Sequence, residues 1–261
     1  MILLNRGLIR ITGSDALAFL QSQLTNDIRQ IELSQVQINA FCQHQGKIIA
    51  LLWVFKKDEN FYLSLPKDLV EKVISRLKIF KMMSDIQIDD MSDLIKQYGL
   101  INEKNHSYKI DNNLSIYTTR KFLENNISSS EWDFVCIKNE LPEISLNASE
   151  RFIPQSLNLD INERGVSFTK GCYPGQEVVA RLHYLGKSKK RLFRFKSKFK
   201  VEVGDKLNTI KSNSLKPAGE IIRATQLEDW FYSLAIFEVE KISENIFLNN
   251  DHDKELTIIH D

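Results

Sequence analysis

The sequence predicts an α+β body of mixed sheets with flanking helices, followed by a small C-terminal β-barrel. Up to about residue 186, segments with strand-like and helix-like patterns follow one another without an internal repeat. After residue 187, phenylalanines alternate with basic residues, and this period of two is typical of a half-buried strand. With 261 residues, 43% of them hydrophobic, the chain can bury a substantial core. We therefore expect a body over residues 1–186, with room for two subdomains, and a barrel module over residues 187–261.

Composition predicts a cytoplasmic protein without a membrane partner. The formal net charge is +1, so no global field attracts nucleic acid or a membrane surface. The longest apolar run, residues 48–55, is far shorter than the roughly 20 residues that span a bilayer. The N-terminus is interrupted at Asn5 and Arg6, before the apolar core of a signal peptide could form. Three cysteines without a CxxC pair argue against a disulfide framework and for a reducing compartment.

The N-terminal elements follow from hydrophobic periodicity. Residues 8–27 predict a strand, a turn at Gly13 and a helix capped by Ser14, and the apolar face of this helix is formed by Leu17, Phe19, Leu20 and Leu24. Strands are expected over 36–42 and 47–56, joined by a polar HQG turn, and over 60–65. A second helix enters through Pro66, and its apolar positions are Leu69, Val70, Val73, Ile74 and Leu77.

The rest of the chain is predicted to be mostly strand. Between residues 84 and 137 short strand-like runs alternate with polar loops, and we place Trp132 and Cys136 on such a strand, with Cys136 buried and inert. Further strands are expected at 219–225 and 232–240, and they complete a small barrel. The tail, residues 251–261, is expected to be peripheral.

Residues 168–181, FTKGCYPGQEVVAR, carry the most chemistry. Pro174-Gly175 is a strong turn signal, since proline presets φ at the first central position and glycine tolerates positive φ at the second. The residues after it have helical spacing, so Cys172 is expected on a loop just before a helix, with Lys170 two residues away. Both the helix dipole and a nearby lysine favour a thiolate. Local chemistry alone leaves two interpretations open, a reactive thiol and a purely structural turn.

Two other features are weaker. Cys42 and His44 offer two metal-ligand types without a third or fourth, and the remaining histidines have no ligand spacing, so no metal site is predicted. The basic run 187–200 could contact tRNA or could be the solvated face of an edge strand. The near-zero net charge favours the second interpretation, although it leaves a tRNA contact open.

The element KGCYPGQE, residues 170–177, resembles the signature of the YgfZ family, and the motif residues are Gly171, Tyr173, Gly175, Gln176, Glu177 and, behind them, Arg181. The resemblance continues over nearly the whole chain. It includes residues 11–27, the CQHQGK hairpin at 42–47, the run FIPQSLNLD at 152–160 and PAGEII at 217–222.

This resemblance implies a fold like that of the glycine-cleavage T-protein and a role as a folate-binding protein linked to iron–sulfur protein maintenance and tRNA modification. Cys172 would be the reactive group and Lys170 its activator. Trp132 matches a tryptophan that the family implicates in folate binding, in a central cleft, and Arg6 stands where better-studied members carry a second one. The implied cofactor is tetrahydrofolate or a related reduced folate. The implied partners are iron–sulfur client enzymes, such as those that methylthiolate tRNA.

The sequence also departs from the T-protein pattern. T-proteins carry paired aspartates, one of them catalytic, where this chain has Ala50 and Leu51. Lys138 and Glu140 likewise replace a T-protein acid and glycine. Without a carboxylate to handle the proton on the folate amine, aminomethyl transfer loses its acid/base group. We therefore expect an accessory factor rather than an enzyme, with a folate-dependent one-carbon transferase and a tRNA-binding module as the alternatives.

Overall fold

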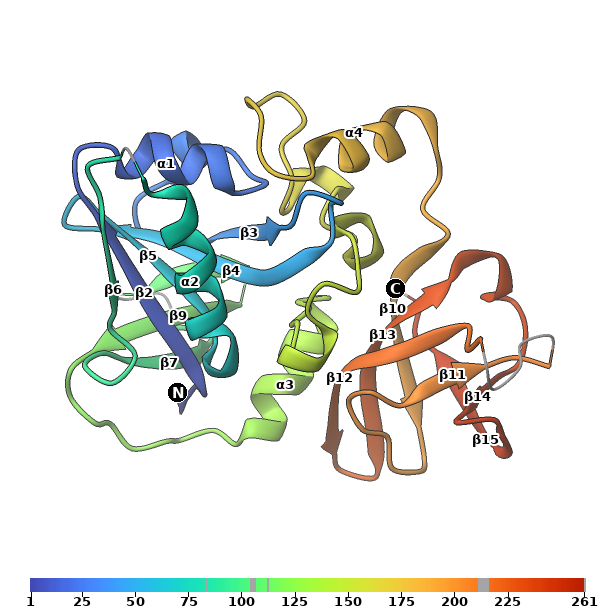
Figure 1. The fold of residues 1–261 in the computed structure, drawn as a ribbon. Helices are drawn as coiled ribbons and strands as arrows, with labels where there is room; N and C mark the ends of the chain where they lie inside the picture. Colours follow the sequence, from blue (N-terminus) through green and yellow to red (C-terminus); the bar gives the residue numbers. More distant parts are fainter. Residues whose placement is uncertain (83, 104–106, 112, 211–215, 261) are drawn as a thin grey trace. The chain divides into compact units, whose positions relative to one another are not determined.

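A computed structural model describes residues 1–82, 84–103, 107–111, 113–210 and 216–260 (Figure 1). The chain divides into two compact units, and it passes between them more than once. Unit 1 comprises residues 1–126, 144–154 and 159–185, and unit 2 comprises residues 127–143, 155–158 and 186–261.

The first layer of unit 1 is a five-stranded antiparallel sheet with the order β3-β4-β5-β2-β6. Its strands are β2 (Arg6–Thr12), β3 (Gln37–Cys42), β4 (Ile48–Lys57), β5 (Asn60–Pro66) and β6 (Gln87–Asp90). Strands β3 and β4 form the hairpin expected around the HQG turn, with Phe41 opposite Ala50. Because the order leaves β3 at one edge, one side of that strand is open to neighbouring loops.

Two helices, α1 (Ala16–Gln23) and α2 (Val70–Phe80), cover one face of this sheet (Figure 1). The main core of unit 1 lies between them and the sheet. The predicted helical spacing is confirmed for α2, because Val70, Val73 and Leu77 are all buried in that core. The start of α1 differs from the prediction: Asp15 is its N-cap, while the Ser14 hydroxyl donates to Asp85 instead.

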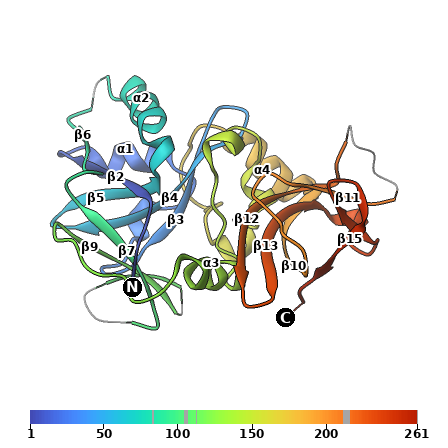
Figure 2. The same cartoon turned by 90° about the horizontal axis from the view of Figure 1, so that it is seen from below.

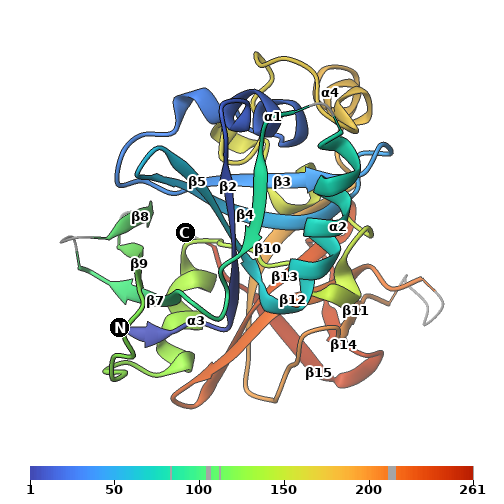
Figure 3. The ribbon, with the colours of Figure 1, turned by 60° about the vertical axis from the view of Figure 1, so that its left-hand side comes forward.

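The second layer of unit 1 is a four-stranded sheet with the order β1-β7-β9-β8 (Figure 3). Its strands are β1 (Ile2–Leu3), β7 (Lys96–Ile101), β8 (Tyr108–Asp111) and β9 (Leu114–Thr119). Side chains alternate between the faces of a strand. Phe55 of β4 therefore points away from the helices, and its ring meets that of Tyr108 at 4.2 Å between centroids.

Unit 2 is built around a closed barrel with the strand order β10-β13-β12-β11-β14-β15. The strands are β10 (Lys190–Ser197), β11 (Lys206–Asn208), β12 (Gly219–Leu227), β13 (Trp230–Glu238), β14 (Ile246–Leu248) and β15 (Asp251–Ile258). The expectation of a peripheral tail is wrong, because β15 pairs with both β14 and β10 and Leu256 is buried in the barrel core. Closure also means that β10 is not an edge strand.

The segment around Trp132 is a helix, not a strand. Helix α3 (Ser129–Lys138) packs on β12 and β13 (Figure 2), and the rings of Phe134 and Tyr232 meet edge to face at 4.7 Å. The helix begins here for a local reason, since Ser128 and Glu131 form a reciprocal capping box at its N-terminus. Cys136 is fully buried, as predicted, but on a helix.

The predicted fold class is confirmed, with an α+β body and a barrel. A fourth helix, α4 (Gln176–Leu185), begins where the sequence predicts it. No helix in the described part of the chain is long and apolar enough to cross a membrane.

Candidate functional site

The signature loop is locked to the β3–β4 hairpin through two glycines. Gly175 has φ +85°, and a β-carbon on it would lie 2.6 Å from both the Gln43 carbonyl oxygen and the Gly46 Cα. Gly46 has φ +76°, and its own β-carbon would meet Val178 of α4 at 3.2 Å. Only glycine permits this approach in this backbone conformation. The CQHQGK and KGCYPGQE motifs therefore form one structural unit.

Lys170 fixes the other side of the loop. Its ammonium donates to three backbone carbonyls at and after the end of α1, those of Gln21 at 2.6 Å, Leu24 at 2.5 Å and Asn26 at 3.1 Å. Burial lowers the pKa of Lys170 to about 8, while the carboxylate of Asp27 acts in the opposite direction. An ammonium has three N–H donors, so the carbonyls use all of them. The predicted activation of Cys172 by Lys170 would have to act through space and stays a prediction.

Cys172 is exposed and lies at an open pocket of about 430 Å³. Leu17 and Ala18 of α1 form much of its apolar surface, and Leu17 is 41% exposed rather than buried in the core. Arg29 also lines the pocket. The Arg29 guanidinium donates two hydrogen bonds to the Asp27 carboxylate, at 2.9 and 2.7 Å. This hydrogen bonding lowers the pKa of Asp27 to about 2. The sequence did not identify Arg29, because no spacing rule links it to a loop so distant in the chain.

The other two thiols are enclosed. Cys42 is 2% exposed at the end of β3, and burial raises the pKa of its thiol. Cys136 lies inside unit 2, where burial raises the pKa of its thiol to about 11. Thiolates are the reactive form of cysteine, so the structure separates one accessible thiol from two protected ones.

The remaining signature residues surround this loop. Tyr173 is buried, burial raises the pKa of its phenol, and its ring centre lies 5.3 Å from the Lys170 ammonium. Gln176 closes the turn by donating its backbone N–H to the Tyr173 carbonyl at 3.1 Å. Glu177 and Arg181 are exposed on α4. Their side chains are therefore available to a partner, whereas Tyr173 holds the loop.

The two predicted folate residues belong to different units. Arg6, in unit 1, stacks on the ring of Trp53 at 3.7 Å and donates to the hydroxyl of Ser64 at 2.8 Å. It lines a pocket of about 250 Å³ together with two lysines, Lys67 and Lys96. Trp132, in α3 of unit 2, is 5% exposed.

The positions of the missing aspartates are buried. Ala50 belongs to the core beneath α1 and α2, while Leu51 faces the opposite side of β4 and is 2% exposed. Neither side chain can donate or accept a proton.

Part of the basic run 187–200, which includes β10, pairs with carboxylates of unit 2. Arg194 pairs with Glu140 at 3.5 Å and Lys200 with Glu202 at 2.6 Å. The ammonium of Lys198 lies 3.9 Å from the centre of the Trp230 ring. These contacts support the interpretation as a solvated strand more than that as a tRNA patch.

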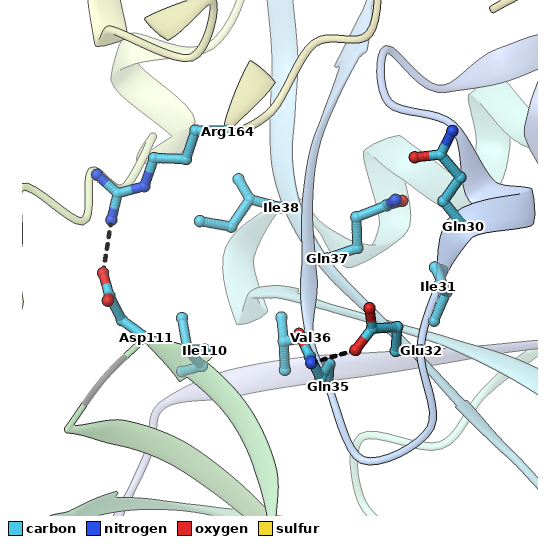
Figure 4. A pocket seen from close by; sticks show the side chains of 10 residues that line it. All are labelled: Gln30, Ile31, Glu32, Gln35, Val36, Gln37, Ile38, Ile110, Asp111 and Arg164. Atoms are coloured by element: carbon cyan, nitrogen blue, oxygen red, sulfur yellow. Dashed lines mark hydrogen bonds and ion pairs between the residues drawn. The ribbon is translucent and has the colours of Figure 1, made fainter. Parts of the chain in front are cut away.

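A further pocket, of about 330 Å³, lies at the open edge of β3 (Figure 4). The sequence signal for it is weak: two glutamines, Gln30 and Gln35, between α1 and β3, and a third, Gln37, at the start of β3.

The chain matches no family model, but it is similar to several bacterial proteins along most of its length. An uncharacterized protein of Haemophilus influenzae is 32% identical over 259 residues, which cover 95% of this chain and 88% of the relative. The "tRNA-modifying protein YgfZ" of Colwellia psychrerythraea is 28% identical over 85% of this chain and 80% of its own. The protein of the same name from Hamiltonella defensa is 26% identical over the whole chain and 90% of its own length.

A solved structure shows which fold the chain has. The crystal structure of the glycine cleavage system aminomethyltransferase T from Bartonella henselae superposes with a TM-score of 0.69. It covers 100% of this chain and 84% of the other, at 11% identity. The chain therefore belongs to the YgfZ family and has the fold of the glycine-cleavage T-protein.

Proposed function

We propose that this protein is a cytoplasmic, folate-binding accessory factor that supports the assembly or repair of iron–sulfur clusters in enzymes that modify tRNA. One observation carries the proposal: Cys172 is the exposed thiol of the three, on a loop held from two sides. The link to tRNA modification comes from the names of the relatives. Three free cysteines fit a reducing compartment.

The loop presents an accessible thiol beside a cationic side chain. Cys172 is exposed, Arg29 lines the same pocket, and α4 begins four residues further on. The contacts of Lys170 and Gly175 hold the backbone on both sides of Cys172.

The pocket at Arg6 supports the folate part of the proposal. Its lining includes Lys67 and Lys96, and cationic donors suit the glutamate carboxylates of a reduced folate. Trp132, in unit 2, is proposed separately as an aromatic side chain that stacks on a pterin ring, and it is 5% exposed. When bound, the reduced folate would supply a one-carbon carrier or a reductant, and the residues of this chain would hold its acidic tail.

A one-carbon transferase is the less suitable alternative. Ala50 and Leu51 are buried and apolar where a T-protein needs a carboxylate. We therefore propose binding of the folate without aminomethyl transfer.

Calorimetric titration of tetrahydrofolate into the full chain tests the folate proposal. Arg6→Ala and Lys96→Gln should weaken binding several-fold. Trp132→Phe should weaken it as well, because a phenyl ring offers less stacking surface than an indole. Lys78→Gln, at an exposed lysine of α2, is the matched control. No binding by the wild type at millimolar tetrahydrofolate would refute the proposal.

A further inference from the structure

The pocket beside Cys172 lies between the outer face of α1 and the signature loop. One wall consists of four residues of α1 in two i,i+4 pairs, Leu17, Ala18, Gln21 and Ser22. Residues four apart lie on the same face of a helix, so these four form one continuous surface. Gly171 and Cys172 of the loop line the pocket as well. Its volume of about 430 Å³ is within the range of small-molecule sites, roughly 300–1,000 Å³.

Lys170 holds the two walls of this pocket together. Its ammonium donates to the Gln21 and Leu24 carbonyls at 2.6 and 2.5 Å, and these bonds tie the loop to the end of α1. Lys170 is 6% exposed, so its ammonium is occupied by backbone carbonyls and is not offered to a ligand. Every residue that lines the pocket belongs to unit 1, and the pocket is therefore a feature of that unit alone.

Arg29 gives the pocket its charge. Among the described residues that line it, Arg29 has the one permanently charged side chain, and this side chain is 59% exposed. Asp27 accepts hydrogen bonds from the Nε and Nη2 atoms of Arg29, and no described residue accepts one from Nη1. A guanidinium group is a strong donor to carboxylates. The Nη1 group therefore suits a carboxylate of a ligand.

The α1 wall favours an aliphatic ligand body. Leu17 is 41% exposed and Ala18 is exposed as well, so both offer apolar surface to the pocket. No carboxylate side chain of a described residue lines the pocket, so a positively charged ligand finds no counter-ion there. An accessible thiol, a single cation and an apolar wall together match a small disulfide that carries carboxylates.

We propose that this pocket binds glutathione disulfide, with a ligand carboxylate on Arg29, and that Cys172 forms a mixed disulfide with one half of the ligand. The Cys172 thiolate attacks one sulfur of the ligand. A new S–S bond forms to Cys172, the S–S bond of the ligand breaks, and the other half leaves as a thiolate. This thiolate takes up the proton that Cys172 released. Cys172 is oxidised and one glutathione is reduced, so the electrons balance.

The adduct would cap the thiol in a reversible way. Attack by reduced glutathione on the mixed disulfide restores Cys172 and forms glutathione disulfide again. The accessibility of Cys172 would therefore follow the ratio of oxidised to reduced glutathione. This inference rests on the proposed function, in which Cys172 is the reactive group.

The test compares three disulfides of different charge on the reduced full-length protein: glutathione disulfide, the uncharged 2-hydroxyethyl disulfide and the cationic cystamine. Intact mass and peptide mapping follow the mixed disulfide at Cys172 with time. Each rate is divided by the rate with N-acetylcysteine amide, an uncharged thiol, which removes the intrinsic reactivity of each disulfide. The normalised rate of glutathione disulfide should exceed that of cystamine at least about ten-fold, because a hydrogen bond to a charged group is gained.

Substitutions in the pocket should change this preference. Arg29→Gln should remove it, and Arg29→Lys, which keeps the charge, should retain most of it. Arg120→Gln, at an exposed arginine outside the pocket, is the matched control and should leave it unchanged. Ala18→Glu places a carboxylate on the α1 wall and should reverse the order of the two charged disulfides. Both Arg29 and Ala18 are exposed, so the core stays intact, and thermal unfolding checks each variant.

The inference is overturned if the three normalised rates are equal, if Arg29→Gln keeps the preference, or if the adduct forms on Cys42 or Cys136 instead. Iodoacetamide separates this failure from failure of the proposed function. If Cys172 is alkylated first and is required for complementation but shows no preference among the disulfides, the proposed function stands and this inference alone fails. If Cys172 is inert to iodoacetamide as well, both fail together.

Discussion

Gly175 and Gly46 approach each other so closely that a β-carbon on Gly175 would stand 2.6 Å from the Gly46 Cα. Both residues have positive φ. This contact joins the signature loop to the β3–β4 hairpin and explains why two glycine-containing motifs occur together in a chain with only 10 glycines.

The first prediction concerns this contact. Gly175→Ala should lower the free energy of unfolding by at least about 2 kcal/mol, since it combines an unfavourable φ with a backbone clash. Gly171→Ala is the matched control, because a β-carbon there meets nothing within 4 Å. Urea unfolding of both variants measures the difference, and equal stabilities would contradict the interlock.

Local patterns predicted much of this fold, while long-range contacts stayed hidden. The alternation of residues 36–42 and the Pro174-Gly175 turn depend on nearby residues, and the structure has both β3 and α4 in place. No local rule states which carbonyls a buried Lys170 will meet, or that β15 closes a barrel, because both depend on tertiary contacts. Ser128 and Glu131 form a capping box, which is a local signal for helix α3, whereas the strand prediction for Trp132 and Cys136 takes no account of it.

The second prediction tests that capping box. Ser128→Ala should destabilise unit 2 by about 1 kcal/mol, because it removes a side-chain acceptor for the Glu131 N–H. Ser129→Ala, one residue further and inside the helix, should be neutral or slightly stabilising. Thermal unfolding of both variants provides the comparison, and a larger loss in Ser129→Ala would contradict the assigned N-cap.

The third prediction follows from burial of Lys170. Its folded pKa of about 8 lies below its ordinary value of 10.5, so between these pH values the unfolded chain holds a proton that the folded chain has released. Raising the pH through this window should therefore stabilise the wild type relative to Lys170→Met. Denaturant unfolding at pH 7.5, 9 and 10.5 measures this difference. A flat or falling difference would show that the three carbonyls keep the ammonium charged.

The fourth prediction concerns Ala50 and Leu51, the two buried residues of β4 that stand where T-proteins carry aspartates. Mixed with the other glycine-cleavage components, the protein should form no methylenetetrahydrofolate above background, because Ala50 and Leu51 offer no acid or base. A genuine T-protein in the same assay is the positive control. Product that depends on this protein would restore the transferase as its function.

The last prediction is that Cys172 is the most reactive thiol of the chain. Cys172 is exposed, whereas Cys42 and Cys136 are 2% and 0% exposed and burial raises the pKa of both thiols. Iodoacetamide labelling of the native protein, followed by mass spectrometry, should therefore modify Cys172 first. The two buried thiols should label only under denaturing conditions.

Cys172 should also be required for function. Cys172→Ser should fail to complement a strain that lacks its own family member, while its folding and its tetrahydrofolate binding stay unchanged. Cys136→Ser, which leaves the exposed thiol in place, is the control for loss of a cysteine, with its folding checked by thermal unfolding. Arg29→Gln should slow the labelling of Cys172, because it removes a positive charge from the same pocket. If Cys136 labels faster than Cys172, or if Cys172→Ser complements fully, the signature is a structural turn and the thiol has no role.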